Sequence, residues 1–181
     1  MLIINFIKDS DRKDLLGKIE QGLQEYQDIW DKDGNRIIEA IESISGLKFK
    51  ENEINAIVYV SSLNSRSFPL SLIADIPLTI KPGLLVHELC HRILSGNRLI
   101  IRAKKYKDLS LEIHKVLNLI FYDILIDLYG EKKTKKTIKW ESSSRSAVYK
   151  DAWNWVLSFN KETRSKKFKN FMDKQSLQEK L

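Results

Sequence analysis

The chain has 181 residues, 43% of them hydrophobic, which is enough to bury one core and excludes disorder over the whole length. Its single cysteine excludes an internal disulfide. No segment reaches the roughly 18 uninterrupted apolar residues of a membrane span, and the apolar run at the N-terminus is too short for a signal peptide. We therefore expect one domain, residues 1–181, in the cytoplasm and without membrane association.

The formal net charge of +7 is unevenly distributed. Residues 1–91 hold 10 Lys and Arg against 14 Asp and Glu, so the remaining residues hold 21 against 10. The C-terminal part, including a helical portion expected at about residues 140–181, is therefore basic. A solvated surface is the favoured interpretation, and binding to nucleic acid or to an acidic partner is the alternative.

The first half of the chain predicts a small sheet with helices packed against it. Residues 1–7 are apolar and β-branched, as in a short strand, and residues 55–60 give the strongest strand pattern. An amphipathic helix is predicted up to Trp30, then a turn at residues 31–35 and a second helix at 36–45. One or two further strands fit residues 70–80, with an exposed sheet edge near residues 72–80 at which a substrate strand would pair. The predicted class is α+β with a small mixed sheet.

The next element is a short helix that carries the sequence His87-Glu88-Leu89-Cys90-His91. Pro82 suits the first helical position, and Ser95-Gly96-Asn97 ends the pattern. Four residues make a little over one helical turn, so both histidines can direct a ring nitrogen at a single metal ion. Glu88 lies about 100° around the helix and stays available for a water molecule.

This helix resembles the active-site helix of the zincin metallopeptidases. The resemblance implies that His87 and His91 bind zinc and that Glu88 is the general base. Zinc would lower the pKa of a bound water and polarise the scissile carbonyl, and Glu88 would pass the water's proton to the leaving amine. Cys90 is expected to be a core residue, because as a ligand it would fill the open position that catalysis needs.

A third ligand is expected on the following helix, predicted over residues 108–129. Asp123 and Asp127 lie four residues apart on one face of an apolar run, and buried carboxylates need a cation or a strong donor. The pair resembles the Glu-x-x-x-Asp helix of the gluzincin branch, although aspartate replaces glutamate and the gap after His91 is longer. The resemblance implies Asp123 as the zinc ligand and Asp127 as the residue that fixes a histidine tautomer.

His114 and Glu112 are the alternatives to Asp123. Nine residues separate His114 from Asp123, so at about 100° per residue the two lie on opposite sides of the helix and cannot both bind. His114 has polar neighbours on its face, which favours a boundary position. Glu112 lies on the Asp123 face three turns earlier.

The sequence therefore predicts a zinc-dependent metallopeptidase that hydrolyses a peptide or protein substrate. The group that would stabilise the oxyanion is left open among four candidates, namely Tyr106, Tyr122, Tyr149 and His114. The alternative is a non-proteolytic zincin-like module that binds protein or nucleic acid through its basic C-terminal half. Glu88 argues against this alternative, because a purely structural zinc site has no use for a base.

Overall fold

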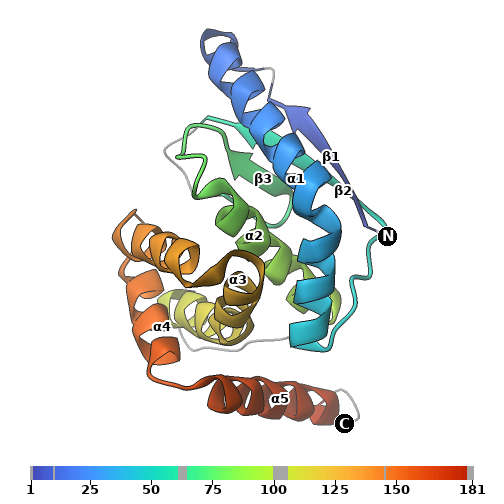
Figure 1. Ribbon diagram of the computed structural model, residues 1–181. Helices are drawn as coiled ribbons and strands as arrows, with labels where there is room; N and C mark the ends of the chain where they lie inside the picture. The colour runs from blue at the N-terminus through green and yellow to red at the C-terminus, as the bar shows by residue number, and fades with distance from the viewer. Residues whose placement is uncertain (1, 10, 61–64, 100–105, 145, 179–181) are drawn as a thin grey trace.

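The computed structural model describes residues 2–9, 11–60, 65–99, 106–144 and 146–178 (Figure 1). Three strands form a sheet in the order β1-β2-β3, with both neighbouring pairs parallel: β1 (Ile3–Lys8), β2 (Glu53–Tyr59) and β3 (Leu70–Ile73). The α+β class is confirmed in its coarse form, as helices packed on a small sheet. The expected mixed sheet is not found, because the three described strands all run in the same direction.

A long helix, α1 (Leu16–Ser45), follows a short 3-10 turn, η1 (Lys13–Leu15), and packs against the sheet (Figure 1). The turn predicted at residues 31–35 is wrong, because α1 continues through it without a break. Gly34 is buried in the helix, and a Cβ at this position would lie 2.9 Å from the Trp30 ring. The glycine therefore provides room for the indole of the preceding turn instead of ending the helix.

The exposed edge predicted near residues 72–80 is only partly present. Strand β3 does lie at an edge of the described sheet, but residues 74–80 form no strand. The Ser71 N–H donates to the Arg66 carbonyl over 2.8 Å, and the Ile73 N–H donates to the Ser65 hydroxyl over 3.3 Å. Two donors of this strand are therefore already used, which argues against the expected pairing with a substrate strand.

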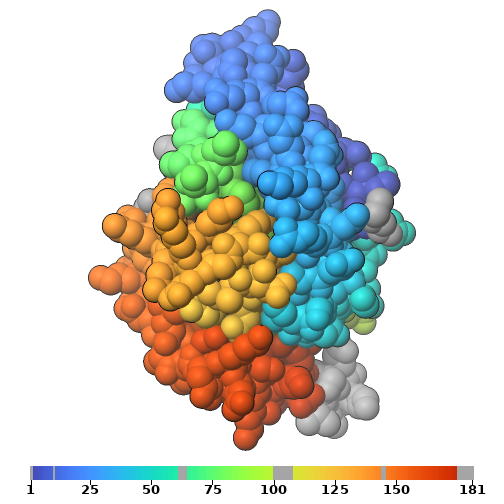
Figure 2. Space-filling model, in the orientation of Figure 1, coloured from blue at the N-terminus to red at the C-terminus, as the bar shows by residue number. Residues whose placement is uncertain are grey.

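The predicted motif helix is present as α2 (Lys81–Gly96), and it is buried over most of its length, as its apolar circumference predicts. On the face shown in Figure 2 its N-terminal end and the preceding segment reach the surface between α1 and the next helix. Of the five motif residues, four are buried and His91 is half-buried.

The next helix, α3 (Tyr106–Ser144), has two arms that meet at Gly130. Gly130 adopts φ 72° and ψ 173°, a conformation that disfavours any residue with a Cβ, and the chain changes direction there. The helix predicted over residues 108–129 is confirmed as the first arm. The second arm, residues 131–144, was not predicted.

The chain ends with α4 (Ala147–Leu157) and α5 (Lys161–Gln178), which pack against α3 (Figure 1). The helical portion expected at about residues 140–181 is present as these two helices and the end of α3. Across the described residues, no helix combines the length and the apolar character that a bilayer crossing requires.

Candidate metal centre

The two histidines of the motif lie one turn apart on α2, as their spacing predicts. Their Nε2 atoms are 3.1 Å apart. His87 is fully buried, whereas His91 is half-buried and provides the more accessible side of the pair. Two imidazole nitrogens at this distance either share a proton or share a metal ion.

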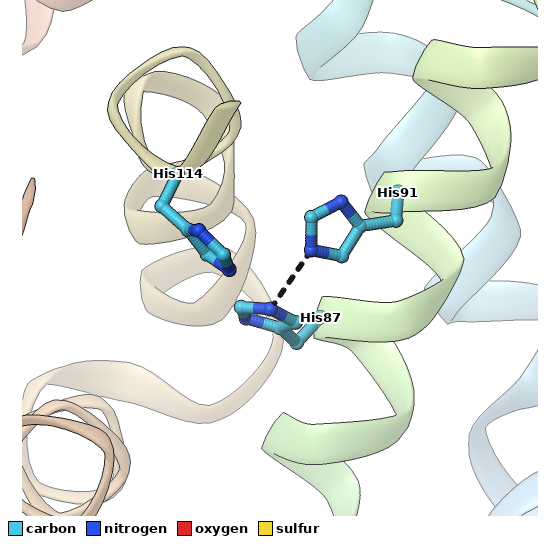
Figure 3. Close-up of side chains that lie close together, drawn as sticks. All are labelled: His87, His91 and His114. Atoms are coloured by element: carbon cyan, nitrogen blue, oxygen red, sulfur yellow. Dashed lines mark hydrogen bonds between the residues drawn. The ribbon is translucent and has the colours of Figure 1, made fainter. Parts of the chain in front are cut away.

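His114 projects from the first arm of α3 toward the same point (Figure 3). One ligand nitrogen from each of the three histidines lies within 4.8 Å of the other two. In a tetrahedral zinc site with Zn–N bonds of about 2.0–2.1 Å, neighbouring nitrogens are about 3.3 Å apart. The three histidines, His87, His91 and His114, therefore lie close enough to bind a metal ion.

In two of the three rings, those of His114 and His87, neighbouring groups favour a proton on Nδ1. The Nδ1–H of His114 donates to the Ser110 carbonyl over 2.7 Å, which leaves the lone pair on Nε2. The Nδ1 of His87 lies 2.9 Å from Oε1 of Glu141, although the two groups are not well aligned for a hydrogen bond. A slight ring rotation would align them. Both contacts favour the tautomer that a metal ligand requires.

Glu141 reaches His87 because the second arm of α3 packs closely on α2. A Cβ at Gly83 would lie 2.7 Å from the Thr137 hydroxyl, so the two helices can approach this closely only at a glycine. One turn further along each helix, His87 and Glu141 meet. The other Glu141 oxygen accepts the Trp153 Nε1–H over 2.8 Å, which fixes the carboxylate from α4.

Comparisons with protein-family models, with curated proteins and with solved structures return no match for this chain. The assignment of a metal centre therefore rests on the histidine geometry and on the contacts around it.

The structure does not bring Asp123 to the histidines. Its carboxylate forms two hydrogen bonds with the Arg164 guanidinium of α5, at 3.0 Å and 2.7 Å. Both side chains are more than nine-tenths buried. Asp123 did need a cation, as its buried position predicts, but that cation is an arginine. The structure therefore corrects the assignment of Asp123 as third ligand and favours His114.

The other acidic candidates also lie elsewhere. Asp127 is exposed, and the contact predicted for it with a ligand histidine is made by Glu141 instead. Glu112 pairs with Lys115 over 2.8 Å and is not part of the histidine cluster. Sequence reasoning missed Glu141 because the second arm of α3 was not predicted, and the residue has no motif of its own.

The two other polar residues of the motif, Glu88 and Cys90, are both buried. Glu88, which lies between the two histidines in the sequence, is buried, with 3% of its surface exposed. Burial, together with the charges of Glu141 and Glu88, raises the pKa of the Cys90 thiol. A thiol that stays protonated is a poor metal ligand, which agrees with a core role for Cys90.

Of the four candidates for oxyanion stabilisation, Tyr149 lies against the histidines, with its ring centroid 4.3 Å from that of His114. The Arg164 guanidinium stacks on the Tyr122 ring at 4.4 Å, away from the cluster. His114 itself belongs to the cluster. The side chain of Tyr106 lies outside the described residues.

We expect Asp123→Ala to lower the free energy of unfolding by about 3–5 kcal/mol, because Arg164 would stay buried without its counter-charge. Replacing both residues, as Asp123→Leu with Arg164→Met, should recover most of that loss. Urea unfolding of the metal-free proteins measures the difference. Equal stability of Asp123→Ala and the wild type would show that the pair is not formed.

We expect Glu141→Gln to weaken zinc binding by about 10- to 100-fold, since a glutamine can keep the Trp153 contact but loses the charge that supports His87. Glu131→Gln, on the same arm but exposed and paired with Lys135, is the matched control and should bind zinc like the wild type. Competition with a chromophoric chelator measures both affinities. Unchanged affinity of Glu141→Gln would remove Glu141 from the site.

Proposed function

We propose that the chain is a zinc-dependent peptidase whose metal is held by His87, His91 and His114. The observation that carries this proposal is the convergence of the two motif histidines with a third histidine from another helix. Three neutral imidazoles leave one coordination position open, which is typical of catalytic rather than structural zinc sites. Imidazole donors also suit zinc well among the transition metals.

A zinc ion at this site would polarise the scissile carbonyl and activate a water molecule for attack. Side chains of the protein would transfer the proton, stabilise the oxyanion and orient the ligand rings. Glu88, which the motif places next to both ligand histidines, would accept the water's proton and donate it to the leaving amine. Tyr149 would donate a hydrogen bond to the developing oxyanion. Ser110 and Glu141 would keep two of the ligand rings in the required tautomer.

The test of this function does not require an identified substrate. An unfolded protein mixture is incubated at neutral pH with the zinc-loaded chain, and new peptide termini are identified by mass spectrometry. We expect termini that disappear when a chelator is added and return with zinc. Termini that persist in the chelator would indicate a contaminating or metal-independent protease, and no new termini would contradict peptidase activity.

A further inference from the structure

A pocket of about 420 Å³ opens beside the half-buried side of the histidine cluster. His91 forms part of its wall, whereas His87 and His114 are buried. A substrate can therefore approach the metal site from the His91 side, past this pocket. Its volume lies within the range of ordinary ligand pockets, which is about 300–1,000 Å³.

The wall of this pocket is mostly apolar. Besides His91, the described residues that line it are Ser67, Phe68, Leu94, Ser95, Leu99, Leu109 and Ile113. None of these described lining residues is an Asp, Glu, Lys or Arg. Against the described part of this wall a charged substrate side chain would lose its hydration without gaining a counter-charge, whereas a large apolar one would be favourably buried.

One wall of the pocket is held by Arg92, the residue that follows His91. Its guanidinium pairs with Glu51 through two nitrogens, one of them at 3.0 Å, and also donates to the Ser67 carbonyl. It stacks on the Phe68 ring at 4.5 Å. Phe68 is about half exposed, so this stacking keeps an apolar ring in place at the surface beside the site.

We propose that this pocket receives a large apolar side chain of the substrate next to the scissile bond, and that Arg92 with Glu51 is the brace that sets its width. The proposal rests on the proposed peptidase function. Two donors of the β3 edge are already used within the chain, so pairing with a substrate strand is not favoured there. The pocket is another place in the fold at which the substrate can be recognised. Specificity would then come mainly from one side chain of the substrate.

The test compares two peptide hydroxamates that differ only in one side chain, isobutyl or carboxymethyl. Binding to the zinc-loaded protein is measured by calorimetry, so no turnover is needed. We expect the isobutyl compound to bind about 10- to 200-fold more tightly, the range typical of hydrophobic pocket discrimination. Equal binding of the two compounds overturns the proposal.

Two variants test the pocket and its brace separately. Ser95→Lys places a charge in the wall from an exposed position and should reverse the preference toward the carboxymethyl compound. Ser165→Lys, exposed on α5, adds the same charge elsewhere and should leave the preference unchanged. Arg92→Lys loses the two-nitrogen contact with Glu51 and should lose most of the preference, with zinc content unchanged.

Zinc content is measured first in every protein, which separates the two proposals. A wild-type chain that holds no zinc overturns both the peptidase function and the pocket assignment. A zinc-loaded wild type that binds both hydroxamates, but in which Ser95→Lys behaves like Ser165→Lys, overturns only the pocket assignment.

Discussion

His114→Ala is expected to release the metal, because it removes one of the three proposed ligands. The loss of affinity should exceed the roughly 10- to 100-fold effect expected for a supporting residue such as Glu141. Elemental analysis after zinc loading and dialysis should find the variant nearly empty. Circular dichroism should show a folded protein, because the imidazole is replaced by a smaller side chain without leaving a buried charge.

The matched control is the double variant Asp123→Leu with Arg164→Met, which removes the carboxylate of the first arm without leaving the arginine unpaired. It should hold zinc like the wild type. If this double variant is empty while His114→Ala keeps its zinc, the third ligand is Asp123 and not His114.

Glu88→Gln is expected to keep zinc and fold but to lose hydrolysis by about 10²- to 10⁴-fold, the effect associated with a positioned general base. Glutamine matches the shape of glutamate but cannot accept the proton of the attacking water. The rate is measured on a peptide released in the unfolded-protein experiment. The zinc content of the same sample shows whether the loss is chemical or structural.

Glu141→Gln is the useful comparison for this variant. At saturating zinc it should recover most of its activity, because its defect lies in affinity, whereas Glu88→Gln should stay inactive at any zinc concentration. A Glu88→Gln protein that cleaves as fast as the wild type would show that Glu88 is not the base.

The motif and its helix could be read from local sequence, because everything they need lies within one helix. The spacing of His87 and His91 places them one turn apart in any α-helix, and Pro82 and Ser95-Gly96-Asn97 mark its ends. The structure agrees, with α2 at Lys81–Gly96.

The third ligand could not be derived in the same way, because α3 is buried on two opposite sides. The sequence shows that Asp123 and His114 lie on opposite faces, which is correct, and that a buried Asp123 needs a cation. It does not show which cation. Arg164 follows Asp123 by 41 residues and reaches it only after α4 and α5 have packed. Tertiary contacts therefore decided between two candidates that local pattern left open.

Glu141 shows a second limit of local reading. Gly130 ends a helix by every local rule, and it does interrupt α3, but the chain resumes as a helix directly afterwards. Only the close packing of Gly83 on Thr137 brings Glu141 to His87. That contact depends on two segments more than fifty residues apart, and no spacing within either segment indicates it.

The central claim is that three histidines from two helices form one metal site, and the zinc content of the wild-type chain tests it most directly. The purified protein is loaded with zinc, dialysed against metal-free buffer and analysed by inductively coupled plasma mass spectrometry. A three-histidine site predicts one zinc per chain. A wild-type protein that remains metal-free after this treatment would contradict the metal site and the function proposed from it.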